Sequence, residues 1–249
     1  DVYDGAPTSV TAFVGTAPKI AAVVFAFRIL VTGMGTIHSD WAPMLAILAV
    51  ASLVVGNLAA IMQTNIKRML AYSTVSHMGF ILLAFMAGAV GFTAGLYYAI
   101  TYALMAAVSF GVLMVLSTKD IECEEIKDLA GLNHRHAWFA FLMLLSMFSM
   151  AGIPPLMGFY AKFGVIMALL KQGYVWLSVF AVIMSLIGAF YYLRVVKVIY
   201  FDAPDHDQPV GSNYAAKFVL TVNAFLLLLW GIMPQTVIDW CAKALENTL

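Results

Sequence analysis

The feature that most limits the fold is an apolar stretch of 35 residues, 137–171, with two consecutive prolines in its middle. A straight helix of that length would be about 50 Å long, whereas the hydrocarbon core of a bilayer is about 30 Å thick. Pro154 and Pro155 also prevent a regular helix from passing, because proline has no amide hydrogen and clashes with the preceding turn. We therefore predict an all-α membrane protein with one helix interrupted between Gly152 and Gly158.

The composition supports a membrane protein: 63% of the residues are hydrophobic, 10% are charged and the mean hydropathy is +0.93. Soluble domains do not have this composition, and the apolar runs are too long for the strands of a membrane barrel. The 13 basic and 13 acidic residues cancel, which argues against a nucleic-acid partner. About seven transmembrane helices are expected, at 8–32, 41–62, 66–88, 92–117, 137–171, 174–201 and 214–233.

The distribution of lysine and arginine predicts how these spans are oriented. One set of alternate loops holds Lys67, Arg68, Lys119, Lys127, Arg135, Arg194, Lys197 and Lys217. The other set holds only Arg28, Lys171 and Lys243. By the positive-inside rule, the first set faces the cytoplasm or the mitochondrial matrix. We expect a multi-pass protein of the bacterial inner (plasma) membrane, with the mitochondrial inner membrane as the alternative.

Two lysines, Lys19 and Lys162, fall inside the expected spans, and Pro18 should kink the first span just before Lys19. A charge in hydrocarbon costs about 3 kcal/mol on insertion scales, and intramembrane ionisable groups usually serve a function. All 13 acidic residues fall in expected loops or tails, so the spans offer these lysines no carboxylate. A buried amine without an anionic partner releases its proton more readily, as a proton carrier requires. The alternatives are snorkelling for Lys162 and a helix boundary near Ala17 for Lys19.

The third expected span carries a polar stripe on an otherwise apolar helix. On a helical wheel Lys67, Ser73, Thr74 and His77 fall within about 120° of one another, and Tyr72 flanks them. We predict that Lys67 and His77 transfer protons together with the two buried lysines, and that the tyrosine, serine and threonine support them. In the alternative, the hydroxyls bond to their own helix and His77 is a satisfied core histidine.

Motifs for covalent or cofactor chemistry are missing from the sequence. Cys123, His134 and His136 fit no standard zinc spacing, and Gly33-Met34-Gly35 lacks the third glycine of a dinucleotide fingerprint. No P-loop, catalytic triad, haem or iron–sulfur ligand pattern is present. We expect no metal and no bound cofactor in this chain.

Four blocks of the chain carry a family resemblance: DVYDGAPTSVTAFVGTAPK at 1–19, QTNIKRMLAYSTVSHMGF at 63–80, DLAGL at 128–132 and AGIPPLMGFYAKF at 151–163. Together they resemble the subunit N family of proton-pumping NADH:quinone oxidoreductase, respiratory complex I, whose mitochondrial counterpart is NADH dehydrogenase subunit 2. The block around Lys67 is also similar to subunits L and M and to Mrp-type cation/proton antiporters.

The resemblance implies an antiporter-like fold of two inverted five-helix repeats. Residues 1–249 would form a single membrane domain: the last helix of the first repeat at 8–32, the second repeat at 41–201, and a closing helix and tail at 214–249. Lys19 resembles the family's central-axis lysine and Lys162 the lysine of its second broken helix, while Lys67, Tyr72 and His77 match polar positions between them. The first broken-helix lysine and its glutamate would precede Asp1, so we expect the C-terminal part of a longer or split polypeptide.

The function so implied is a proton-translocating membrane-arm subunit without a redox centre, driven by redox chemistry in other subunits of the enzyme. NADH, FMN, iron–sulfur clusters and quinone are expected in partner subunits, with other complex I membrane subunits and the lipid bilayer as the contacts of this chain. The alternative is a subunit of an Mrp-type cation/proton antiporter, which should show a buried Asp or Glu for the metal ion. A lipid-facing scaffold without transport is disfavoured by the buried lysines.

Overall fold

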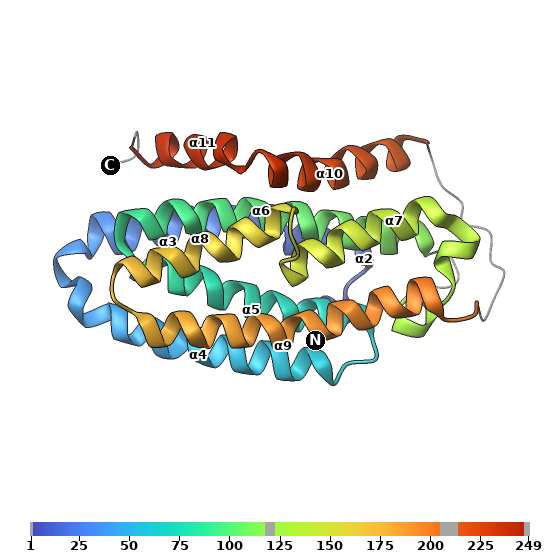
Figure 1. Cartoon of the computed structure of the whole chain (residues 1–249), viewed down its shortest axis with the longest axis horizontal. Coiled ribbons are helices and arrows are strands. Elements are labelled where there is room, and N and C mark those ends of the chain that lie inside the picture. Colours follow the sequence, from blue (N-terminus) through green and yellow to red (C-terminus); the bar gives the residue numbers. More distant parts are fainter. Residues whose placement is uncertain (1, 118–122, 205–213, 247–249) are drawn as a thin grey trace.

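The computed structural model describes residues 2–117, 123–204 and 214–246, which are helical with no strand beyond an isolated bridge between Asn65 and Glu125. The long helices lie side by side along one common direction, as a membrane bundle requires (Figure 1). The elements are α1 (Val2–Gly5), α2 (Thr8–Gly15), α3 (Ala17–Phe27), η1 (Arg28–Gly33), η2 (Gly35–Ile37), α4 (His38–Ile61), α5 (Ile66–Met86), α6 (Gly88–Leu116), η3 (Ile126–Leu129), α7 (Leu132–Ala151), α8 (Met157–Lys171), α9 (Val175–Phe201), α10 (Tyr214–Ile232) and α11 (Pro234–Glu246).

The expected number of membrane crossings agrees with the structure. Six helical segments of the described residues are long and apolar enough to span a bilayer: Thr8–Val31, Gly35–Ile61, Ile66–Met86, Gly88–Leu116, Val175–Phe201 and Tyr214–Ile232. The two half-helices α7 and α8 follow one another across the bundle and make the seventh crossing (Figure 1). The all-α membrane fold is therefore confirmed.

The predicted interruption lies where the prolines are. α7 ends at Ala151, Gly152 adopts φ = +87°, and α8 begins at Met157, with Lys162 in its second turn. The amides of Gly152 and Ile153 donate to the carbonyls of Ser149 and Phe148, both at 3.0 Å, which is the Schellman ending of a helix. This ending satisfies two of the carbonyls that the break would otherwise leave without partners.

The N-terminal boundary of this crossing was expected at residue 137, and the continuous part of the helix begins there, after a kink. α7 begins at Leu132, and His136 inside it has non-helical angles, φ −146° and ψ 72°, so the helix is kinked there. Of the residues 132–136 that precede it, all but Leu132 are polar or charged, and a hydropathy criterion therefore assigned them to the loop.

The first span is also not one regular helix over 8–32. It breaks at Thr16, φ −119° and ψ −87°, and its last turn, η1, is a π-helix. The Thr16 amide donates to the Phe13 carbonyl, so the Thr16 hydroxyl donates to the Ala12 carbonyl in its place, at 2.8 Å; Pro18 has no amide hydrogen to continue the helical ladder. The kink expected before Lys19 is therefore present, two residues before the proline.

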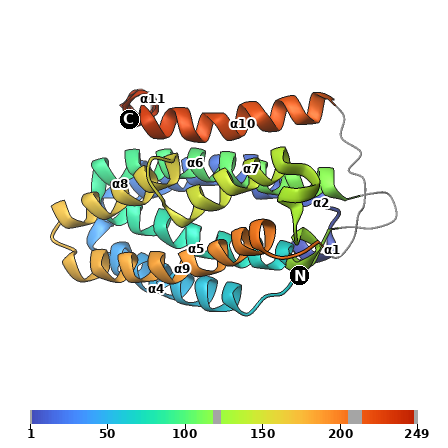
Figure 2. The same ribbon diagram turned by 45° about the vertical axis from the view of Figure 1, so that its right-hand side comes forward.

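α5 lies in the middle of the bundle and positions most of the polar groups described below. It packs against α4 on one side and against α6 and α8 on the other, while α9 lies beside α4 and α7 (Figures 1 and 2). The polar stripe of α5 is therefore surrounded by other helices of the bundle.

The bundle has two chemically different ends. The α4–α5 turn with the start of α5, η3 with the start of α7, the end of α9 and the start of α10 lie together at one end, on the right in Figure 1. We call this the basic end, because these segments carry Lys67, Arg68, Lys127, Arg135, Arg194, Lys197 and Lys217. Lys119, assigned to the same side, lies outside the described residues. The α8–α9 turn with Lys171 lies at the opposite end, as the orientation argument requires.

The expected tail is a helix rather than an extended segment. α11 continues from α10 after Met233, and its buried side chains Val237, Cys241 and Leu245 pack against α6. Asp239 and Glu246 thus lie in a helix, and Asp40, expected in a loop, lies in the first turn of α4.

Candidate functional site

The best-defined polar site forms around Lys162 at the helix interruption. The Lys162 side chain is 8% exposed, and its ammonium donates to the Ala151 carbonyl at 3.0 Å and to Ser185 Oγ at 2.9 Å. Ala151 is the last residue of α7, so the ammonium sits at the negative end of that helix's dipole. Within the described residues Lys162 forms no ion pair, and the break itself supplies the acceptor that a carboxylate would otherwise provide.

The glycines of the interruption bring the two half-helices close together. A Cβ on Gly158 would lie 1.9 Å from the Ser149 carbonyl oxygen, and the Gly158 amide donates to Ser149 Oγ at 3.1 Å. On the outer side, Gly231 of α10 packs against the break, since its Cβ would lie 2.1 Å from the Pro155 carbonyl oxygen. Gly152, Pro154, Pro155 and Gly158 thus shape the site without contributing a titratable group.

Lys19 lies in the first turn of α3 and points into the bundle rather than to lipid. Its ammonium donates to the Tyr102 hydroxyl at 3.2 Å and lies over the Tyr102 and Tyr3 rings, 4.6 and 5.3 Å from their centroids. The Tyr102 hydroxyl also forms a hydrogen bond with Thr74 of α5, whose hydroxyl bonds to the Leu70 carbonyl. Lys19 is therefore joined to the polar stripe through one tyrosine.

His77 occupies the centre of α5 between two tyrosines. Its ring is 3% exposed, with Nδ1 2.8 Å from the Tyr98 hydroxyl and Nε2 2.9 Å from the Tyr192 hydroxyl. Its ring centroid also lies 4.9 Å from that of Tyr102, the partner of Lys19. Each ring nitrogen thus has a hydroxyl partner that can donate or accept, in keeping with either tautomer.

A small cavity connects His77 to Lys162. It offers about 10 Å³ to the centre of a water-sized sphere, close to the room that one water molecule needs. Its walls include His77, Lys162, Ser185, Asn57 and Tyr191. Protein groups therefore link Lys19 to Thr74 and His77 to its tyrosines, and the cavity completes the link to Lys162.

We call this arrangement the polar row: Lys19, Tyr102, Thr74, Tyr98, His77, Tyr192 and Lys162. The row crosses the bundle from α3 to α8 through α5, α6 and α9. The buried Lys162 and the half-buried Lys19 thus belong to one cluster, and the ammonium of each points into the bundle. Between Tyr102 and His77 the described residues show a ring contact and no hydrogen bond, so the polar route between the lysines, like the role of each residue, stays a prediction.

Lys67 is buried but lies apart from the row. It is ten residues before His77 on α5, about 15 Å along the helix, and its ammonium is 2.9 Å from Glu124 Oε1. Around it, the Ile66 amide donates to the Glu124 carbonyl and the Ile126 amide to the Thr64 carbonyl. These contacts fasten the segment before η3 to the start of α5 at the basic end.

The remaining residues of the stripe fit one of two interpretations, which are support of proton transfer and hydrogen bonding within their own helix. Ser73 is buried and donates to the Leu70 carbonyl of its own helix at 2.8 Å, whereas Thr74 also reaches Tyr102. Tyr72 is half-buried, and its hydroxyl makes no hydrogen bond with any other described residue. Of the supporting residues expected from the sequence, Thr74 bonds directly to Tyr102 of the row, and the Ser73 side chain also interacts with Tyr192.

The sequence-based prediction missed the tyrosines. Tyr98 and Tyr102 lie one turn apart on α6, and Tyr192 lies on α9, all about 1% exposed. The four-residue spacing of two tyrosines inside an apolar span was the available signal, because such a pair shares one face of a helix. Ser185 and Asn57, single polar residues in apolar runs, carried a similar signal.

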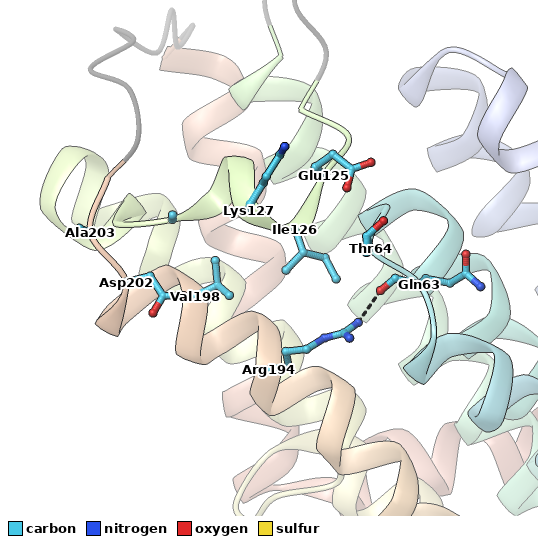
Figure 3. A pocket seen from close by; sticks show the side chains of 10 residues that line it. Gln63, Thr64, Glu125, Ile126, Lys127, Arg194, Val198, Asp202 and Ala203 are labelled. Atoms are coloured by element: carbon cyan, nitrogen blue, oxygen red, sulfur yellow. Dashed lines mark hydrogen bonds between the residues drawn. The ribbon is translucent and has the colours of Figure 1, made fainter.

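A larger pocket opens at the basic end (Figure 3). It has a volume of about 570 Å³ and lies between the α4–α5 turn, the segment around η3 and the end of α9. Arg194 on its wall donates to the carbonyl of Ile61, the last residue of α4, at 3.0 Å and to that of Gln63 in the α4–α5 turn at 2.6 Å. Lys127, Glu125 and Asp202 also line it, and Asp202 is paired with Lys197.

No metal centre is formed by the part of the chain that the structure describes: it has no group of three or more His, Cys, Asp or Glu placed to hold an ion. Cys123 and Cys241, both buried, are free thiols on different elements. The chemistry of the site is therefore that of lysine, histidine, hydroxyls and backbone carbonyls.

Comparison with known proteins agrees with this geometry. The family described as NADH:quinone oxidoreductase/Mrp antiporter, TM, matches residues 1–188. NADH-quinone oxidoreductase subunit N of Neisseria gonorrhoeae is 83% identical over 250 residues, which cover 100% of this chain and 52% of the relative. The subunit N of Laribacter hongkongensis is 56% identical over 254 residues, again 100% and 52%. The chain spans about half the length of the curated relatives it matches.

Solved structures give the same result. A chain of respiratory complex I from Thermus thermophilus with bound Aureothin has a TM-score of 0.83 at 30% identity, covering 96% of this chain and 52% of that chain. The Mrp complex from Dietzia sp. DQ12-45-1b gives a TM-score of 0.88 at 21% identity, with 98% and 54% covered, which shows the fold alone. Since the family match extends over three quarters of the sequence, the chain belongs to the NADH:quinone oxidoreductase/Mrp antiporter family of membrane subunits.

Proposed function

We propose that this chain moves protons across the bacterial inner membrane as part of a subunit N of NADH:quinone oxidoreductase, driven by redox chemistry in partner subunits. The observation that carries the proposal is the polar row, in which two lysines that make no ion pair with any described carboxylate flank a histidine inside a membrane bundle. The 83% identity to a protein named subunit N supports the assignment to that enzyme rather than to an Mrp antiporter.

Each part of the row has a group that exchanges protons. The ammonium groups of Lys19 and Lys162 can each give up a proton, and His77 can take one on either ring nitrogen. The hydroxyls of Tyr102 and of the two tyrosines beside His77 can each donate and accept a hydrogen bond, so they can pass a proton without holding a charge. The cavity beside Lys162 has about the room that one water needs to complete the transfer between His77 and Lys162.

Lys162 is held in a way that suits a group that changes its charge. The Ala151 carbonyl at the end of α7 favours the protonated form, while burial favours the neutral one. The two influences oppose one another, so a modest movement of α7 relative to α8 changes the proton affinity of Lys162. In this proposal, redox steps elsewhere in the complex act on this chain by moving the half-helices.

The proposal also assigns the elements to a larger subunit. α2 and α3 would be the last helix of a first repeat, the elements from α4 to α9 a second repeat, and α10 and α11 a closing segment. The chain itself would hold no redox centre, and NADH, FMN, iron–sulfur clusters and quinone would bind to other subunits. Other membrane subunits of the complex and lipid would contact its outer faces.

The test replaces His77 by Gln in the whole subunit within its assembled complex. Glutamine can still bond to one of the two tyrosines, but it does not take up a proton near neutral pH. We expect a lower number of protons translocated per electron pair in membrane vesicles, with normal amounts of assembled complex. Met78→Leu, on the neighbouring position of α5, serves as the control. An unchanged proton ratio in His77→Gln would contradict the role of the row.

A further inference from the structure

We propose that the pocket at the basic end binds the headgroup of a phospholipid from the membrane leaflet at that end. The headgroup that fits is zwitterionic, with a phosphate and a primary ammonium, as in phosphatidylethanolamine. The volume of about 570 Å³ is in the range of small-molecule sites. None of the residues that line the pocket belongs to the polar row, so this inference stands apart from the proton-transfer function.

The pocket lies at the depth of lipid headgroups. The apolar span of α4 ends at Ile61, and Gln63 and Thr64, which follow closely, line the pocket. On α9 the wall runs from Arg194 to Asp202, which is about 12 Å along the helix and ends just beyond its apolar span. The headgroup region of a bilayer begins directly outside the hydrocarbon core, so the pocket extends across that boundary.

The pocket also adjoins a surface that lipid chains can cover. α4 and α9 pack against each other along one edge of the bundle (Figures 1 and 2). Near the pocket, Leu58 and Met62 of α4 are exposed. Phe190 and Leu193 of α9 are exposed as well. Acyl chains can therefore lie on these side chains while the attached headgroup enters the pocket, whereas a water-soluble ligand would leave this apolar surface uncovered.

Two cationic side chains supply the phosphate side of the site: Arg194 from α9 and Lys127 from η3 (Figure 3). The Ile61 and Gln63 carbonyls take two of the five N–H groups of the Arg194 guanidinium, and its Nε has no acceptor among the described residues. Lys127 forms no ion pair with any described residue. A phosphate group offers both cations the anionic acceptor that suits them.

Two carboxylates in the same pocket favour a zwitterionic headgroup over an anionic one. Asp202 is paired with Lys197, and Glu125 accepts a hydrogen bond from the Asp128 amide. Each carboxylate has about four acceptor positions, so both can also bind an ammonium group. A primary ammonium donates to them, a quaternary choline has no hydrogen to donate, and a further negative charge would be repelled.

The order of the charges matches that of a lipid whose chains point into the membrane. Arg194 lies about 12 Å closer to the membrane centre along α9 than Asp202 does. In phosphatidylethanolamine the phosphate is likewise closer to the acyl chains than the ammonium. The structure therefore assigns the phosphate to the inner part of the pocket and the ammonium to the outer part.

The test compares two lipids by photocrosslinking. The assembled complex is placed in phosphatidylcholine nanodiscs that contain a small fraction of phosphatidylethanolamine with a diazirine in one acyl chain, or of phosphatidylglycerol with the same chains. After irradiation, mass spectrometry measures the labelling of peptides from α4 and α9. We expect about fivefold more labelling by phosphatidylethanolamine, as one additional charge-assisted hydrogen bond permits.

Variants of the pocket have matched controls. Val198→Trp fills the pocket and should lower labelling by phosphatidylethanolamine to the level of phosphatidylglycerol, whereas Val182→Trp, at an exposed position of the same helix, should not. Glu125→Gln combined with Asp202→Asn removes both negative charges with little change of size, and should abolish the preference. Asp40→Asn, at the opposite end of α4, should leave the preference unchanged.

Equal labelling by the two lipids in the unaltered complex, or stronger labelling by phosphatidylglycerol, would overturn the proposal. A preference for phosphatidylethanolamine that survives the paired carboxylate replacement would overturn it too, even if Val198→Trp does not assemble. Crosslinking needs no turnover, so either result would leave the proton-transfer function to be judged separately by the His77 variant.

Discussion

Replacing Gly158 by Ala should loosen the helix interruption and weaken the subunit. Gly158 is the second residue of α8, and an added Cβ there would lie 1.9 Å from the Ser149 carbonyl oxygen and 2.9 Å from Ser149 Oγ. Real Cβ atoms keep at least 3.0 Å from such neighbours, and a backbone carbonyl cannot rotate away as a flexible side chain does. α8 must therefore move away from α7 by about 1 Å.

The size of the effect follows from that movement. Overpacking of this kind costs about 1–3 kcal/mol, which exceeds the gain of up to about 1 kcal/mol from alanine's better helix propensity. The same movement stretches the contact between Lys162 Nζ and the Ala151 carbonyl from 3.0 Å toward about 4 Å, which is too long for a hydrogen bond. Proton translocation per electron pair should therefore fall together with stability.

The assay follows the assembled complex after stepwise heating, by native gel electrophoresis. The temperature at which half of the complex is lost should fall by about 2–10 °C in Gly158→Ala. Gly164→Ala is the matched control on the same helix, because its Cβ would meet only Ala94 Cβ, at an ordinary 3.6 Å. That control should be neutral or stabilising by about 0.5–1 kcal/mol. Equal behaviour of the two variants would refute the close packing of the break.

Two further predictions concern other parts of the chain. Burial raises the pKa of the Cys123 thiol to about 12, so the thiolate is scarce below that pH. Alkylation by iodoacetamide should therefore stay slow from about pH 7 to 9 until the protein is denatured, and rapid labelling of the folded complex would contradict this. Tyr102→Phe removes the hydroxyl between Lys19 and Thr74 but keeps the ring. Assembly should be normal, while the rate of proton translocation in vesicles falls by about tenfold or more. A normal rate of proton translocation would show that Tyr102 is not part of the row.

The helix interruption was predictable because its causes are local. Pro154 and Pro155 exclude a regular helix whatever surrounds them, and the apolar length of 137–171 requires two half-helices. Pro18 predicted the kink of the first span for the same reason. The exact ends of the helices were less predictable, since a short helical turn that begins at Leu132 precedes the kink at His136 and α11 forms where a tail was expected.

The partners of the charged groups could not be predicted, because they come from distant segments. Hydropathy gives no rotation of one helix against another, so it could not tell that Tyr102 meets Lys19 or that Tyr192 meets His77. The wheel placed Lys67 on the same stripe as His77, yet its partner Glu124 comes from a loop 57 residues away. A stripe on one helix predicts a shared face, whereas the connection along that face depends on its neighbours.

The central claim is that Lys162 carries protons, and replacing it tests this most directly. Lys162→Ala removes a buried charge whose desolvation is costly, so the complex should still assemble. If Lys162 served only a structural role, its loss would instead lower the amount of assembled complex. Lys162→Arg keeps the charge but does not release a proton near neutral pH, so it should fail as a relay and survive as an electrostatic support. The measurement is the number of protons translocated per electron pair in vesicles, normalised to assembled complex. Our account predicts a reduced ratio in both variants, and a normal ratio in both would contradict it.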